Sequence, residues 1–229
     1  MLNITTYYEQ LFEKIKDIGI ESCLNHDSIA KVHAFIEEID KWKSILSNLS
    51  ESDMIENVKK ELQFSLLCNN IGLYRQSIAS LRLCYEILFS FIYFSANKID
   101  FQEWKLSKSD IKWSLIMSDE NGVFSERFIK AFFPNYTEDI SLFRENCRNS
   151  YRKMSEFIHG NYHTWNLLPE GLNFDAEMNQ KWFSHFELLS EHIFLLLHYR
   201  FFNDYKVLHL QKIREINSEN ILRHIDGRV

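Results

Sequence analysis

The scarcity of helix-breaking residues constrains this chain more than any other feature of its sequence. Only six Gly and two Pro occur among 229 residues, and Leu, Ile, Phe, Lys and Glu follow one another in long runs. Gly and Pro are the residues that most often interrupt or end a helix. Because 45% of the residues are hydrophobic, the chain can also bury a large core. We therefore expect an all-α protein.

Apolar residues at helical spacing, with capping residues before them, predict where the helices lie. Two packing helices are expected in the first 50 residues, over residues 4–19 and from Asn25 or Asp27 to about Leu46. We interpret residues 1–50 as an N-terminal helical extension packed on the core, and residues 51–229 as the main bundle. The helices expected in that bundle cover residues 53–70, 74–96, 137–159, 175–202 and 205–216, and residues 97–136 form an irregular, aromatic-rich insertion.

Charge, cysteines and hydropathy limit the classes of function. The net charge of −6 argues against a protein that coats nucleic acid generally, since such proteins need an extended cationic surface. Four scattered cysteines indicate free thiols in a reducing compartment and no structural zinc. No signal peptide is recognisable, and the longest apolar run, residues 87–96, is too short to span a bilayer. We expect a soluble cytoplasmic protein with no membrane partner.

One ion pair is predicted within the most apolar helix. Arg82 and Glu86 stand four residues apart in residues 74–96, so their side chains can meet on the helix surface. A charge in such surroundings is usually paired, because burying it alone costs several kcal/mol. The pair either holds two helices together or orients a functional site.

The most informative segment is residues 151–161, at the end of a predicted helix. Arg152 and His159 are seven residues apart, and seven steps of about 100° return a helix to nearly the same face. Gly160 and Asn161 follow, and both residue types tolerate the left-handed conformation that ends helices. We therefore expect His159 in the last turn, on the same stripe as Arg152.

A row of arginines leads to that histidine. Arg144 and Arg148 precede Arg152 at four-residue steps, and Ser155 continues the stripe toward His159. Guanidinium groups bind phosphates well, because each is a planar fork of donors that keeps its charge. The alternative is a solvated or salt-bridged helix face.

This arrangement resembles the HEPN superfamily. The resemblance lies in the Arg152-x6-His159 motif near the end of a long helix, and in a preceding core helix with Leu81, Arg82 and Glu86. It covers roughly residues 51–202. HEPN proteins have an up-and-down four-helix bundle, and many are metal-independent ribonucleases of toxin, antiphage-defence and RNA-processing systems. The resemblance thus implies this bundle as the core of the chain.

The resemblance also implies a catalytic chemistry and its residues. Metal-independent RNA cleavage uses the 2′-hydroxyl as nucleophile, so the site must move a proton and stabilise charge on phosphorus oxygens. His159 would be the general base or acid and Arg152 the electrostatic stabiliser. No metal and no cofactor are implied. Supporting roles fall to Arg148 and Lys153 as RNA contacts, to Ser155 or Asn161 in holding the imidazole, and to Glu86 in orienting the site.

The partners implied are RNA, a second copy of the chain, and a cognate antitoxin or other defence-system protein. HEPN proteins often pair two bundles so that both motifs face one cleft, which predicts a homodimer. The alternative function is a non-catalytic HEPN-like module that binds a protein partner, RNA or a nucleotide through the same arginines. The acidic net charge and Lys153 favour that alternative.

Other constellations are weaker. Glu156-x-x-His159 has the spacing of a di-iron ligand pair, but no second copy of this spacing is present. The histidines His185, His192 and His198 share one helix without carboxylates or cysteines to complete a metal site, so we expect core or surface histidines. Finally, the aromatic residues of the insertion either stack bases or pack over the end of the bundle; they are Trp104, Trp113, Phe124, Phe128, Phe132 and Phe133.

Overall fold

The structure is a computed structural model that describes residues 3–137 and 139–216. Every regular element within these residues is a helix, which confirms the all-α prediction. The elements are α1 (Ile4–Ser22), η1 (Cys23–Asn25), α2 (His26–Ile45), α3 (Asp53–Asn70), α4 (Tyr74–Ala96), α5 (Lys98–Lys105), α6 (Trp113–Ile116), α7 (Glu126–Phe132), α8 (Ser141–Ile158), α9 (Tyr162–Trp165) and α10 (Ala176–Ile216).

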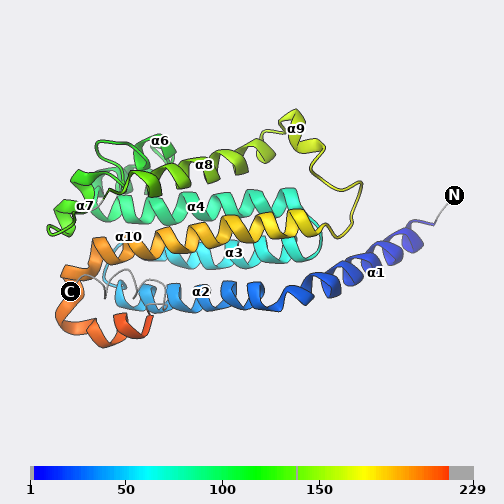
Figure 1. The fold of residues 1–229 in the computed structure, drawn as a ribbon, viewed down its shortest axis with the longest axis horizontal. Helices are drawn as coiled ribbons and strands as arrows, with labels where there is room; N and C mark the ends of the chain where they lie inside the picture. Colours follow the sequence, from blue (N-terminus) through cyan, green and yellow to red (C-terminus); the bar gives the residue numbers. More distant parts are fainter. Residues whose placement is uncertain (1–2, 138, 217–229) are drawn as a thin grey trace.

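The long helices lie side by side in a bundle with α4 at its centre (Figure 1). Helix α4 contacts α3, α8 and α10, and its side chains are apolar nearly all round, with Tyr85 and Phe89 fully buried. In the described part of the chain, α4 alone is long and apolar enough to cross a membrane. Most of it is buried by neighbouring helices, as expected for the central helix of a bundle.

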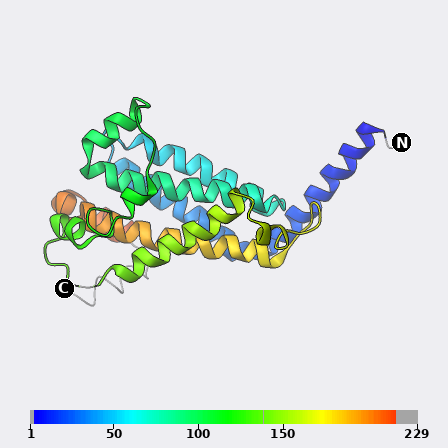
Figure 2. The same cartoon turned by 90° about the horizontal axis from the view of Figure 1, so that it is seen from above.

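The two N-terminal helices differ in how they meet the bundle. Helix α2 packs against α3 and α10, and buries Phe35, Ile39 and Trp42. Helix α1 instead projects beyond the end of the bundle (Figures 1 and 2), and its buried residues are Ile18 and Ser22. The helix also continues past the predicted end at residue 19, since a glycine inside a helix costs only about 1 kcal/mol.

The insertion between α4 and α8 folds over one end of the bundle. It contains α5, α6 and α7, and its aromatic side chains pack on the core: Phe124 is fully buried, and Phe89 contacts both Trp113 and Phe124. Trp104 packs against Phe94. Of the two roles open for these aromatic residues, packing is therefore the one that the structure shows.

Two other boundaries differ from the predicted ones. The short helix α9 lies between the helices predicted over residues 137–159 and 175–202, where no helix was predicted, and α10 is one helix where two were predicted. The start of α8 is held by Asp139, whose Oδ1 accepts a hydrogen bond from the backbone N–H of Ser141 at 2.8 Å and whose pKa is lowered by this bond. Glu138 and residues 217–229 lie outside the described residues.

Candidate functional site

The motif helix α8 ends where the sequence predicts. Gly160 has a φ of +63°, and the backbone N–H of Asn161 donates to the carbonyl of Glu156 at 3.1 Å, closing the left-handed turn that follows many helices. The guanidinium of Arg75 donates a second bond, to the carbonyl of Phe157. Because α8 stays regular up to Ile158, His159 caps the helix and lies in its last turn.

Arg152 and His159 are both open to solvent. The side chain of Arg152 is 82% exposed, and its nearest anion is the carboxylate of Glu156, 3.9 Å from Nε. His159 is also exposed, and none of the bonds found among the described side chains involves its imidazole. A guanidinium and an imidazole can therefore both reach a ligand at this end of the bundle.

A second imidazole at this end was missed by the sequence analysis. His163 Nε2 lies 3.1 Å from the carboxylate of Glu156, so Glu156 stands between Arg152 and His163. Glu156 and His163 are seven residues apart, a spacing that would place them on one face of a continuous helix. Because a helix end was predicted at Gly160, between them, this spacing did not predict a contact. The bond is possible because the chain turns at Gly160 and α9 folds back toward the end of α8.

Two aromatic side chains stand beside these groups. Tyr162 is 81% exposed and Trp165 is 64% exposed, values unusual for large aromatic residues. The indole N–H of Trp165 donates to the carbonyl of Gly160 at 3.0 Å, which anchors this ring next to the end of α8. We call Arg152, Glu156, His159, His163 and Trp165 the open end of α8.

The other arginines of the row are occupied. Arg144 Nε lies 3.0 Å from the carboxylate of Asp119 and Arg148 donates to the same carboxylate at 2.8 Å. Arg148 also donates to the carbonyl of Met117, and Arg144 to that of Phe124 at 3.3 Å. These guanidiniums hold the insertion against α8, so the predicted continuous row of three open arginines is not formed. Of the two interpretations of that row, the salt-bridged face describes Arg144 and Arg148.

Arg82 and Glu86 form the predicted ion pair, at 3.0 Å, and they do so inside a cluster with α8. The hydroxyl of Tyr151 donates to Glu86 and accepts from Arg82, and Arg82 Nε donates to Ser155 Oγ at 2.9 Å. Ser155 in turn donates to the carbonyl of Tyr151 at 2.8 Å. Glu86 and Ser155 thus both bind Arg82 and Tyr151, and these bonds run to neither Arg152 nor His159.

This cluster is shielded by the insertion. The ring of Trp113 stacks on Tyr151 with centroids 4.0 Å apart and planes 13° from parallel. Burial, together with the hydrogen bond to Glu86, raises the pKa of Tyr151 well above its usual range. The phenol therefore stays protonated and keeps donating to the carboxylate, which makes the cluster a structural link between α4 and α8.

Lys153 lies on a different side of α8, near a buried histidine. Ser150 Oγ is 2.7 Å from Nδ1 of His185, and Tyr85 donates to the backbone carbonyl of His185 at 2.7 Å. Burial, together with the positive charges of Lys153 and Lys181, lowers the pKa of His185 to about 4. His185 is accordingly a neutral core histidine that joins α4, α8 and α10.

The comparisons add no relative. No known protein family, no curated protein and no solved structure matches this chain. Across the described ranges there is also no group of three or more His, Cys, Asp or Glu side chains placed to hold a metal ion. The open end of α8 and the motif within it are therefore the features of this chain that point to a function.

Proposed function

We propose that this protein is a metal-independent HEPN-type endoribonuclease whose site is the open end of α8. The observation that carries the proposal is the exposure of Arg152 and His159 together at one helix end, while the neighbouring arginines are occupied. The motif Arg152-x6-His159 gives this pair its place in the HEPN pattern.

The proposed reaction is an internal transfer of the phosphoryl group. The 2′-oxygen attacks phosphorus while a base takes the 2′-hydroxyl proton, the bond from phosphorus to the 5′-oxygen breaks, and an acid protonates that leaving oxygen. The products are a 2′,3′-cyclic phosphate and a 5′-hydroxyl. Arg152 stabilises the negative charge that grows on the non-bridging oxygens, and its full charge and planar fork suit this role.

Two proton-transfer groups are needed, and the open end has two imidazoles. His159 serves as general base or acid. We assign the complementary role to His163, whose Nε2 is held 3.1 Å from Glu156. A carboxylate in this position orients an imidazole.

The exposed rings supply contacts that suit single-stranded RNA. Unpaired bases stack on aromatic side chains, which is worth about 1–3 kcal/mol per base. Trp165, fixed by its bond to Gly160, would hold a base beside the phosphate that Arg152 contacts. Asn161, exposed just beyond the end of α8, is a supporting RNA contact in this proposal. Lys153, exposed on the adjacent side of the helix, is a second supporting contact. A protein of net charge −6 would in this way bind RNA at one local site.

The wider role follows from the resemblance. We propose a cytoplasmic effector of a toxin or antiphage-defence system, acting as a homodimer and restrained by a cognate antitoxin or another protein of that system. Expression toxicity gives a first indication, because an unrestrained ribonuclease arrests growth and its His159→Ala variant does not.

The test is cleavage of RNA in a chelator. Purified protein would be incubated with total RNA and with a tRNA pool in EDTA, beside Arg152→Ala, His159→Ala and His163→Gln. We expect each variant to lose at least about 100-fold in rate, the usual contribution of a general acid or base. Arg127→Ala is a matched control, since Arg127 is an exposed arginine of the insertion that donates a hydrogen bond to Asn121.

A substrate control separates this chemistry from other cleavage. An oligonucleotide with a single 2′-deoxy substitution at the cleaved position should resist cutting there, because it lacks the nucleophile. Cleavage that survives the His159→Ala substitution, or that ignores the 2′-deoxy substitution, would contradict the proposal.

The second candidate is a non-catalytic HEPN-like module that binds RNA, a nucleotide or a protein through the same end. The occupied state of Arg148 favours it, because fewer free cations remain to stabilise a reaction. RNA binding that weakens in Arg152→Ala, without cleavage by the wild-type protein, would select this candidate.

A further inference from the structure

The N-terminal helix carries an apolar stripe that the bundle does not cover. Apolar residues recur in α1 at steps of four and three residues, as in the seam of a coiled coil: Ile4, Tyr8, Leu11, Ile15 and Ile18. Only the last of these is buried. On either side of the seam, Tyr7 is 51% exposed and Phe12 is 62% exposed. The projecting helix therefore has the pattern of a packing helix without a partner in this chain.

The amount of exposed apolar surface is large for a single chain. The ring side chains on α1 cover about 200 Å² each when free, and Tyr7, Tyr8 and Phe12 each expose about half or more of that area. With Ile4, which is 67% exposed, the arm presents roughly 500 Å² of apolar surface. The largest apolar patch of a typical monomer is about 300–600 Å², and such patches often mark interaction sites.

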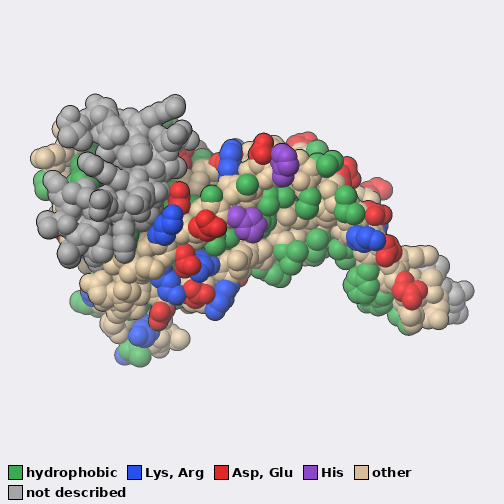
Figure 3. All heavy atoms as spheres, turned by 90° about the horizontal axis from the view of Figure 1, so that it is seen from below, with side chains coloured by type: hydrophobic (Ala, Val, Ile, Leu, Met, Phe, Trp, Pro, Cys, Tyr) green, Lys and Arg blue, Asp and Glu red, His purple; other side chains and the backbone are tan. Residues whose placement is uncertain are grey.

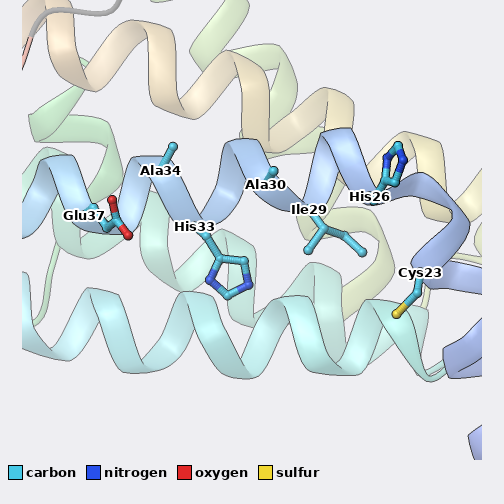
Figure 4. A pocket seen from close by; sticks show the side chains of 7 residues that line it. All are labelled: Cys23, His26, Ile29, Ala30, His33, Ala34 and Glu37. Carbon is cyan, nitrogen blue, oxygen red and sulfur yellow. The ribbon is translucent and has the colours of Figure 1, made fainter.

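The next helix, α2, has a groove along its exposed face. A shallow, open pocket follows α2 (Figure 4), and it is lined by Cys23, His26, Ile29, Ala30, His33, Ala34 and Glu37. Short side chains at Ala30 and Ala34 leave room for another helix to approach closely. Figure 3 shows apolar side chains over the N-terminal arm and over the middle of the molecule on one face, beside two histidines.

We propose that a second copy of this chain covers both surfaces, with α1 of each copy lying in the α2 groove of the other. The lengths match: α1 has 19 residues and α2 has 20, and only the short turn η1 separates them. Two copies that run in opposite directions across η1 place both arms at once. The large side chains of α1 fill the space above the alanines of α2.

The area supports a stable dimer. Twofold symmetry buries each arm and each groove once per copy. An arm of roughly 500 Å² covers a similar area of groove, so the two together exceed the ~800 Å² per partner that stable interfaces bury. Charge argues against a membrane as the occupant, because Glu9, Glu13, Asp17 and Glu21 make α1 net acidic and anionic lipid headgroups repel it. The surface is separate from the open end of α8, so this inference does not rest on the proposed ribonuclease activity.

The test is the mass of the full chain in solution, measured by light scattering or sedimentation over a wide range of concentration. We expect a dimer for the wild-type protein and a monomer for Phe12→Glu, which places a charge within the exposed apolar surface beside the seam. Gln10→Glu is the matched control: it adds the same charge to an exposed site two residues away, off the seam, and should stay dimeric. Ala34→Arg fills the groove from the other side and should also give a monomer.

Cross-linking locates the contact. Cys23 lies in η1 and is the exposed one of the four cysteines, so a short bismaleimide should join two copies through it. The cross-linked dimer should disappear in Phe12→Glu and in Cys23→Ser. Circular dichroism and thermal unfolding of each variant would show that the fold is kept, which is expected because Phe12 and Ala34 are exposed.

Three results would overturn the proposal. One is a wild-type monomer at every concentration, and another is a dimer that persists in both Phe12→Glu and Ala34→Arg. The third is a monomer that binds vesicles of phosphatidylcholine and phosphatidylglycerol through α1, which would make a lipid surface the occupant.

Discussion

The two halves of α8 carry the same residue type and meet different surroundings. At the insertion side, Arg144 and Arg148 share the carboxylate of Asp119 and hold the insertion in place. At the open end, Arg152 is 82% exposed and only loosely paired with Glu156. Helical spacing places these arginines on one face of α8. The segment that packs over each arginine then decides whether its side chain forms structural contacts or stays free to bind a ligand.

The largest effect on stability is expected at His185, a buried histidine that contacts Ser150 between the two halves of α8. His185 has a pKa of about 4 in the folded protein against an ordinary value of 6.5, so the unfolded chain takes up its proton first. The free energy of unfolding should therefore fall as the pH falls from 6.5 to about 4, by roughly 3 kcal/mol for this group. His198, with a pKa also lowered to about 4 by burial, adds a similar loss.

Protonation of one partly buried carboxyl group, that of Glu38, has the opposite effect on the free energy of unfolding. Burial raises the pKa of Glu38 to about 7, so this group stabilises the fold as the pH falls from 7 toward 4.5. Urea unfolding of the wild-type protein and of His185→Gln at a series of pH values separates the contributions. The difference between the two proteins should change by about 3 kcal/mol between pH 6.5 and pH 4. A constant difference would mean that His185 is not held neutral.

The next largest effect on stability is expected in the cluster that Arg82 and Glu86 form with α8 beneath the insertion. Arg82→Ala leaves the carboxylate of Glu86 without its cation and removes a bond to Ser155. Both charged side chains are about one-fifth exposed, so solvent offsets part of the loss, and we expect about 2 kcal/mol of destabilisation. Chemical unfolding measures it. A loss no larger than that of Arg152→Ala would show that the cluster does not link α4 to α8.

One substitution should free the arginines in the structural half of α8. Asp119→Asn removes the anion that holds Arg144 and Arg148, at a stability cost of about 1 kcal/mol because this carboxylate is largely exposed. The freed guanidiniums should raise the affinity for single-stranded RNA several-fold and steepen its dependence on salt. Fluorescence anisotropy at several salt concentrations measures both. An unchanged affinity would place these arginines away from the path of the RNA.

The helix boundaries of this protein are predicted well wherever neighbouring residues in the sequence determine them. The helix at residues 74–96 and the end of α8 at His159 follow from capping residues and apolar spacing, and the structure agrees. The predicted end at Gly19 was wrong, because a glycine inside a helix is only weakly unfavourable.

The site was less predictable, for a physical reason. Arg148 meets Asp119 across 29 positions of sequence, and Tyr151 meets Glu86 across 65. No periodicity within one helix reports which distant segment folds over it. The contact of His163 with Glu156 was not predicted either, because helical periodicity does not continue past the end of α8.

The most direct test of the account compares Arg148→Ala with Arg152→Ala in the same two assays, RNA cleavage or binding in EDTA and unfolding by urea. We predict that Arg152→Ala loses at least about 100-fold in activity while its free energy of unfolding changes by less than about 0.5 kcal/mol. Arg148→Ala should show the reverse, with about 1 kcal/mol of destabilisation and activity within a few-fold of wild type. Equal effects of the two substitutions on activity, or none from Arg152→Ala, would contradict the division of α8 into a structural half and a functional end.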